Sequence, residues 1–188
     1  MANYEPVTIR VASASDAAAI ASIYAAIVSE TTISFEIEPP TPEGMAERIV
    51  RTVAMYPWLV ADRDGRVVGY AYSSQHRERA AYRWSVDVSA YVSADFRRSG
   101  IGRALYKRLF SILRAQKFRS AFAGITLPND ASVGLHEAMG FTPLGIYKEV
   151  GFKLGQWRDV GWWQLALSGD AGQPDEPVPF QGGNQFRN

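Results

Sequence analysis

The segment Tyr91–Leu105 constrains the fold of this chain more than any other feature. An alternating run of apolar and polar residues, Trp84–Val92, ends within it, and Arg97–Gly102 then supplies two arginines and two glycines before an amphipathic helical pattern begins. Glycines let a backbone approach a bound group closely, and the N–H groups at a helix N-terminus attract negative charge. The segment therefore predicts a strand, a loop and a helix that together bind an anion, with the arginines adding charge-assisted hydrogen bonds.

Two common phosphate-binding motifs do not fit this loop. A P-loop has Lys followed by Ser or Thr after its last glycine, whereas Gly102 is followed here by Arg103 and Ala104. A dinucleotide-binding fingerprint has Gly or Ala where this chain has Leu105, and an acidic residue about 20 positions further on that is missing here. Another kind of phosphorylated ligand is therefore expected.

Basic residues are concentrated from this loop onward. The formal net charge of the whole chain is only +1, which argues against general nucleic-acid binding. The segment from 97 to 119 nevertheless holds eight basic residues and no acidic one. This concentration suits a polyanionic ligand, although a solvated helix face would also explain the helix residues. The eight are Arg97, Arg98, Arg103, Lys107, Arg108, Arg114, Lys117 and Arg119.

Composition indicates one globular domain, expected over residues 1–168, followed by a flexible tail. The chain has 188 residues, of which 47% are hydrophobic, and residues 169–188 are rich in Gly, Pro, Gln and Asn, so we expect them to lie outside the fold. The absence of cysteine excludes disulfides, thiolate zinc sites and a cysteine acyl-enzyme. We find no signal peptide and no apolar run as long as a membrane span, so we expect the cytoplasm and no membrane partner.

Periodicity predicts a mixed α/β domain with one central sheet. The expected order is strand, two helices, three strands, helix, strand, helix and two strands. Ser15 or Asp16 is expected to cap the first helix, Thr41 with Pro42 to open the second, and Asn129 or Asp130 to cap the last. The strands are expected at 7–11, 58–62, 66–73, 84–92, 120–126, 141–147 and 160–167.

Two motifs of this chain resemble those of the GNAT acetyltransferase superfamily. The segment Arg97–Gly102 fits the pattern Arg/Gln-x-x-Gly-x-Gly/Ala of its pyrophosphate loop, and Leu127–Phe141 is similar to its Asn-x-x-Ser…Gly-Phe segment. Further segments narrow the resemblance to the phosphinothricin and methionine sulfone (or sulfoximine) N-acetyltransferases, over about Val7–Leu167. These segments are Thr31-Thr32…Phe35, Tyr56–Ala61, Tyr82–Trp84, Tyr91–Ser93, Leu135–Ala138 and Asp159–Gln164.

The resemblance implies a fold, a reaction and a cofactor site. The fold would be a mostly antiparallel mixed sheet flanked by about four helices, with its middle strands splayed apart. The reaction would be direct acetyl transfer in a ternary complex, from acetyl-CoA to the α-amine of a small amino-acid-like acceptor, without a metal. Ala90, Tyr91 and Val92 would hold the pantetheine arm and thioester. The pyrophosphate would bind Arg97, Arg98, Ser99, Gly100, Ile101, Gly102 and Arg103, and Asn129 and Ser132 would contact the other side.

Asp87 and His136 are the candidate catalytic residues. The acceptor must lose a proton, because an ammonium group has no lone pair for attack. Asp87 stands where related enzymes usually carry Glu as the proposed base, and His136 shares a helix face with Asn129 and Ser132. A solvent-facing carboxylate and a buried, backbone-bonded histidine are the structural alternatives. Tyr106 is an alternative general acid, although packing explains it better.

The resemblance places the acceptor site around the loop before the catalytic strand. Guanidinium groups there suit a carboxylate, phosphinate or sulfone, although a flexible surface loop is the simpler interpretation. His76 replaces an aromatic residue that relatives often carry. Relatives also form homodimers, so the segment 153–160 is a candidate contributor to a neighbour's site. The expected acceptor-binding residues are Phe35, Arg77, Arg79, Tyr82, Asp87, Val88 and Ser89.

Two other functions compete with this one. A GNAT enzyme for a different acceptor, such as a protein N-terminus or a polyamine, is the first, and the basic pair Arg77 and Arg79 argues against a polyamine. A CoA-binding module without activity is the second, and the retained acid at Asp87 argues against it.

Overall fold

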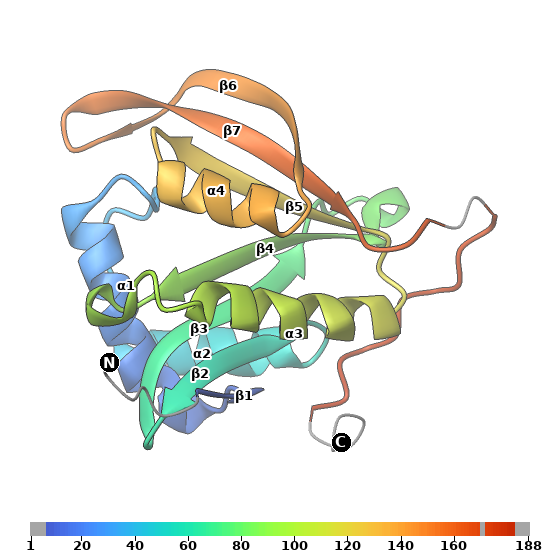
Figure 1. The fold of residues 1–188 in the computed structure, drawn as a ribbon, viewed down its shortest axis with the longest axis horizontal. Helices are drawn as coiled ribbons and strands as arrows, with labels where there is room; N and C mark the ends of the chain where they lie inside the picture. Colours follow the sequence, from blue (N-terminus) through green and yellow to red (C-terminus); the bar gives the residue numbers. More distant parts are fainter. Residues whose placement is uncertain (1–6, 170–171, 183–188) are drawn as a thin grey trace.

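The computed structural model describes residues 7–169 and 172–182, and its centre is one seven-stranded sheet (Figure 1). The strands lie in the order β1-β2-β3-β4-β5-β7-β6, and every neighbouring pair is antiparallel except β4 and β5, which are parallel. Their bounds are β1 Thr8–Val11, β2 Trp58–Arg63, β3 Arg66–Gln75, β4 Ser85–Val92, β5 Ser120–Leu127, β6 Thr142–Lys153 and β7 Gln156–Ala166.

Four α-helices cover the two faces of the sheet: α1 Ala17–Glu30, α2 Pro42–Val53, α3 Ile101–Ala115 and α4 Asp130–Ala138. The side chains of β2 alternate between the two faces. Trp58 and Val60 pack in the core beneath α1 and α2, while Leu59 and Ala61 pack in the core beneath α3. The predicted mixed α/β class and element order are confirmed.

The predicted helix starts have clear local causes. At α2, Thr41 Oγ1 accepts a hydrogen bond of 3.1 Å from the Gly44 N–H, and Pro42 occupies the first turn. At α4, Asn129 Oδ1 accepts a hydrogen bond of 3.2 Å from the Ser132 N–H. At the first helix, Asp16 caps α1, but a short 3-10 turn, η1 Ala14–Asp16, precedes it. Two more such turns, η2 Ala80–Tyr82 and η3 Ala94–Phe96, were not predicted.

The last hairpin is longer than the sequence pattern indicated. The predicted strands 141–147 and 160–167 were too short, because β6 and β7 continue to a turn at Leu154 and Gly155, both with positive φ. The pairing register shifts between Tyr147 and Gly151, and this irregularity breaks the alternation on which strand prediction depends. None of the helices in the described part of the chain has the length and apolar character of a membrane span.

The described part of the tail packs on the domain, unlike the expected free segment. Phe180 is buried at 6% exposure, and its N–H donates to Met55 O over 3.1 Å. The backbone of Val178 exchanges hydrogen bonds with Gln116: its N–H donates to Gln116 O, and its carbonyl accepts from Gln116 Nε2. Arg83 also forms a bidentate ion pair with Glu176. The prediction of a mobile tail was based on the average composition of residues 169–188. Such an average does not reveal that a single aromatic residue, Phe180, anchors the segment.

Replacing Phe180 with Ala should destabilise the domain. The truncation removes a buried ring and leaves a cavity, so we expect the free energy of unfolding to fall by about 3 kcal/mol in urea titrations. Val178→Ala is the control: its side chain is 44% exposed, so a loss of no more than about 0.5 kcal/mol is expected. Equal losses in the two variants would mean that the ring does not anchor the tail.

Candidate active site

The site begins where β4 and β5 separate. The two strands pair at Ser85–Ser120, Val86–Ala121 and Asp87–Phe122, and the pairing ends there. From Val88 onward the backbone of β4 therefore has its β5-facing groups available for a ligand. The sequence resemblance implied splayed middle strands, and this register confirms them. Asp87 stands at the closed end of the resulting V.

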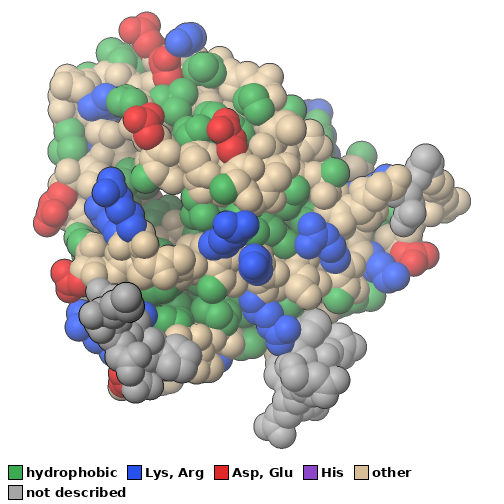
Figure 2. Space-filling view, viewed as in Figure 1, with side chains coloured by type: hydrophobic (Ala, Val, Ile, Leu, Met, Phe, Trp, Pro, Cys, Tyr) green, Lys and Arg blue, Asp and Glu red, His purple; other side chains and the backbone are tan. Residues whose placement is uncertain are grey.

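A long groove lies between the end of β4, α1 and α4, and runs to the N-terminus of α3. Its volume is about 790 Å³, and it continues into a small inner pocket of about 50 Å³ between β4, β5 and α4. Figure 2 shows the hollow in this face, with Lys and Arg side chains on its rim and over α3. The groove and the inner pocket share Ile33, Ala90, Tyr91, Asn129, Ser132 and His136.

The arginine- and glycine-rich loop forms one end of the groove. Arg98 (φ 61°) and Gly100 (φ 83°) both adopt left-handed conformations, which turn the chain into α3. The first N–H groups of α3, like those of any helix, lack intrahelical partners. A Cβ added at Gly102 would lie 3.1 Å from Leu135 Cδ2, so glycine there lets α3 and α4 approach closely. The loop thus combines unpaired N–H groups with two exposed guanidinium side chains, Arg97 and Arg98.

All but one of the residues predicted for the cofactor line the groove. Ser99 is the exception, because its hydroxyl donates to Phe96 O within the loop. The members that line it are Ala90, Tyr91, Val92, Arg97, Arg98, Gly100, Ile101, Gly102, Arg103, Asn129 and Ser132.

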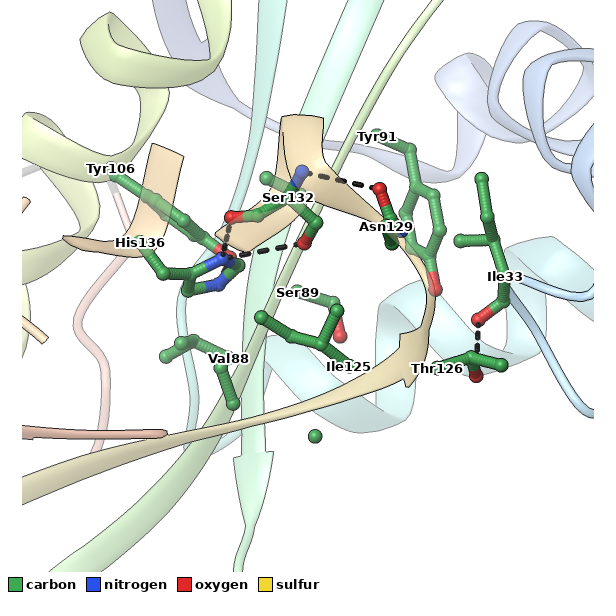
Figure 3. A pocket seen from close by; sticks show the side chains of 13 residues that line it. Ile33, Val88, Ser89, Tyr91, Tyr106, Ile125, Thr126, Asn129, Ser132 and His136 are labelled. Atoms are coloured by element: carbon green, nitrogen blue, oxygen red, sulfur yellow. Dashed lines mark hydrogen bonds between the residues drawn. The ribbon is translucent and has the colours of Figure 1, made fainter. Parts of the chain in front are cut away.

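His136 lies on the wall of the inner pocket with both ring nitrogens hydrogen-bonded (Figure 3). Its Nδ1 is 2.7 Å from Ser132 O, an acceptor, so Nδ1 carries the proton. Nε2 is then the acceptor for the Tyr106 hydroxyl, 2.9 Å away. Burial lowers the pKa of His136, which keeps the ring neutral, and burial raises the pKa of Tyr106 far above its usual value.

This arrangement leaves His136 without a free lone pair for a substrate proton. Its surroundings are those of the structural alternative to a catalytic role, a buried histidine hydrogen-bonded to the backbone. Tyr106 has a polar role beyond packing, because its hydroxyl oxygen reaches the wall of the same inner pocket.

Asp87 has a partner that the sequence did not indicate. Its Oδ1 is 2.7 Å from Nδ1 of His76, the residue that follows the end of β3. Burial raises the pKa of Asp87, while the His76 hydrogen bond and the charges of His76 and Arg77 act in the opposite direction. The pairing depends on the β3–β4 register, in which Gln75 faces Val86.

The predicted acceptor residues divide into two places. Arg77 and Tyr82 gather near Asp87: the Arg77 guanidinium lies 5.6 Å from the Trp162 ring centroid, and the Tyr82 ring is 6.1 Å from that of His76. Val88 and Ser89 line the inner pocket, and Arg79 is exposed at the start of η2. Phe35 packs instead against the hairpin, where a side chain at Gly151 would overlap its ring. Neither Trp162 nor Phe122 was predicted for the site.

The described residues contain no cluster of three or more His, Asp or Glu side chains that could hold a metal ion.

The sequence model of the acetyltransferase (GNAT) domain matches residues 9–162. The chain belongs to the GNAT acetyltransferase family. It is 44% identical to phosphinothricin N-acetyltransferase from Streptomyces viridochromogenes, over 92% of this chain and 93% of that protein. It is 35% identical to the L-methionine sulfoximine/L-methionine sulfone acetyltransferase of Salmonella typhimurium, over 85% and 94% of the two chains.

A solved structure of a GNAT superfamily phosphinothricin acetyltransferase from Sinorhizobium meliloti, in complex with acetyl-CoA, has the same fold. Its TM-score is 0.88 at 38% identity, over 94% of this chain and 98% of that one. The resemblance read from the loop and from the segment 127–141 is confirmed at the level of the family.

The burial of His136 predicts that the stability of the protein depends on pH. Its pKa in the folded chain is lowered from the ordinary value of 6.5, so between these two values the unfolded chain binds more protons. The free energy of unfolding should therefore fall as the pH drops below about 6.5. In His136→Asn this part of the slope should disappear, measured by urea unfolding at closely spaced pH values. An unchanged slope would mean that the ring titrates alike in both states.

Proposed function

We propose that this protein is an N-acetyltransferase that transfers the acetyl group of acetyl-CoA to the α-amine of a small amino-acid-like acceptor. The transfer is direct, within a ternary complex, since the chain has no cysteine to form a thiol acyl-enzyme. The observation that carries the proposal is the V between β4 and β5, which has an anion-binding helix N-terminus at one end and a carboxylate, Asp87, at the other.

The groove fits acetyl-CoA in shape and charge. We propose that Arg97, Arg98 and the first N–H groups of α3 bind the pyrophosphate. The free edge of β4 at Ala90–Val92 can pair with the pantetheine amides, as a neighbouring strand would. Asn129 and Ser132 line the opposite wall. Acetyl-CoA supplies the activated acetyl group, and the chain orients the thioester toward the closed end of the V.

The acceptor is proposed to bind on the Asp87 side. Asp87 provides a negative charge for an ammonium group, and Arg77 provides a positive charge for a carboxylate, phosphinate or sulfone. Relatives named for phosphinothricin and for methionine sulfoximine or sulfone support acceptors of this class. We propose that His136 is a positioning residue that holds the Tyr106 hydroxyl at the inner pocket, and that the protein acts in the cytoplasm.

The central test measures release of coenzyme A thiol from acetyl-CoA across a panel of amines. The panel contains phosphinothricin, methionine sulfone, methionine sulfoximine, ordinary amino acids, a polyamine and a peptide with a free N-terminus. We expect turnover on at least one amino-acid-like acceptor. Turnover only on the peptide or the polyamine would establish the competing acceptor classes, and binding of acetyl-CoA without turnover would support a binding module.

The double variant Arg97→Ala/Arg98→Ala should bind acetyl-CoA more weakly. Losing two charge-assisted contacts should raise the KM for acetyl-CoA about 10-fold or more, with kcat nearly unchanged. Lys107→Ala on the same helix is the control, because Lys107 is exposed outside the groove lining. If the two variants had the same KM in steady-state kinetics, the loop would not be the pyrophosphate site.

The β6–β7 hairpin supports a homodimer in this proposal. It carries exposed large apolar side chains on an edge of the sheet: Leu144, Ile146, Tyr147, Val150, Phe152, Leu154 and Trp157, each at least 50% exposed. Such a concentration is typical of a protein–protein interface. Phe152 and Trp157 also pack on each other, with ring centroids 5.3 Å apart. A second copy would cover this surface, and the segment 153–160 could then reach its acceptor site.

Size-exclusion chromatography with light scattering should give about twice the chain mass of 20.8 kDa. Trp157→Ser should shift the protein toward the monomer, because 59% of that side chain is exposed in the single chain. Ile37→Ser is the control, a similarly exposed apolar residue at 71% in the loop after α1. A monomeric wild-type protein would reject the dimer.

A further inference from the structure

His76 lies in a rigid aromatic setting beside Asp87. Its ring stacks on Phe122 with centroids 4.2 Å apart and planes at 15°. The rings of Tyr82 and Trp162 approach its ring at 6.1 Å each, at 67° and 81°. These neighbours come from η2, β5 and β7, so three elements fix the plane of the imidazole.

The hydrogen bond to Asp87 determines which nitrogen of His76 is available. An ionised carboxylate can only accept hydrogen bonds, so His76 Nδ1–H donates to Asp87 Oδ1 over 2.7 Å. In the neutral ring the lone pair is then on Nε2. An aspartate that holds a histidine in one tautomer and stabilises its protonated form is an established way to build a base.

We propose that His76 is the proton acceptor for the ammonium group of the acceptor, with Asp87 as the residue that orients and stabilises its ring. This inference rests on the proposed acetyl transfer and assigns the base within that same site. In this proposal the imidazole of His76, rather than the carboxylate of Asp87, removes the proton.

The position of the pair suits this role. Asp87 occupies the last paired position before the strands part, and its partner there is Phe122, the residue on which His76 stacks. The next residues of β4, Val88 and Ser89, line the inner pocket. The pair thus lies one residue along β4 from that pocket, and in this proposal the thioester carbonyl lies at this end of the strand. Asp87 Oδ1 is already hydrogen-bonded to His76 Nδ1, so proton removal is assigned to Nε2 of the imidazole.

The charged and titratable groups around His76 are few. Asp87 faces it from β4, Tyr82 from η2, and Arg77 follows it in the chain. Within the described residues, the ring contacts between His76 and the strands β5 and β7 are with the aromatic side chains of Phe122 and Trp162.

The proton balance closes without a further reactant. The acceptor ammonium gives one proton to Nε2 of His76, and its nitrogen then attacks the thioester carbon. The C–N bond forms, the C–S bond breaks, and the second proton of the nitrogen passes to the coenzyme A sulfur. His76 returns its proton to water. An ammonium and a thioester thus give an amide, a thiol and one proton.

His76→Asn tests the role directly, because the asparagine amide can still donate to Asp87 while it offers no basic nitrogen. We expect kcat to fall about 100-fold or more with the acetyl-CoA KM within about twofold, and the acid limb of the kcat/KM profile to disappear. Glu78→Gln, an exposed carboxylate in the same loop, is the control and should behave as wild type. A His76→Asn variant with wild-type kcat and pH profile would overturn the proposal and leave His76 with a positioning role only.

Nuclear magnetic resonance gives a second readout that does not depend on activity. The chain has two histidines, His76 and His136, so long-range ¹H–¹⁵N spectra of wild type and His76→Asn assign both rings. We expect His76 to carry its proton on Nδ1 in the pH range of activity. A proton on Nε2 alone, or a fully protonated ring throughout that range, would overturn the proposal. Absence of wild-type turnover on every amine would instead reject the proposed function, whatever tautomer His76 shows.

Discussion

The separation of β4 from β5 after the Asp87–Phe122 pair is the constraint on which the site depends. A continued parallel ladder would use the backbone groups of residues 88–92 in the sheet and would close both cavities. Separation exposes those groups and lets a ligand pass between the strands. It also joins the two sides of the sheet, so that a thioester held near α3 and α4 can meet an amine held near Asp87.

Charge is arranged along the same axis. Arginines and the unpaired N–H groups of α3 stand at the open end, where a polyanion would bind, and the acidic partner of His76 stands at the closed end. Between them the inner wall is nearly uncharged, because burial keeps both His136 and Tyr106 neutral. The reacting bond would thus lie among neutral hydrogen-bonding groups, away from the charged rim.

Prediction from sequence succeeded where the signal was local. Thr41 with Pro42 and Asn129 identified helix starts, and the loop 97–102 identified the turn into α3, because capping and left-handed turns depend on a few consecutive residues. It failed where contacts joined distant segments. The hairpin was predicted too short because its register shifts near Gly151. The tail was expected to lie free because the burial of Phe180 depends on residues more than 60 positions away, such as Gln116 and Met55.

The sequence by itself determined the family, the order of elements and the arginine- and glycine-rich turn into α3, since short motifs and periodicity encode all three. The tertiary structure decided how the titratable groups are used. His136 and Asp87 were both catalytic candidates in the sequence. In the folded chain both ring nitrogens of His136 are hydrogen-bonded, to Ser132 and Tyr106, and Asp87 is hydrogen-bonded to His76. Those partners are set by strand register and helix packing, which bring together residues that no local pattern connects.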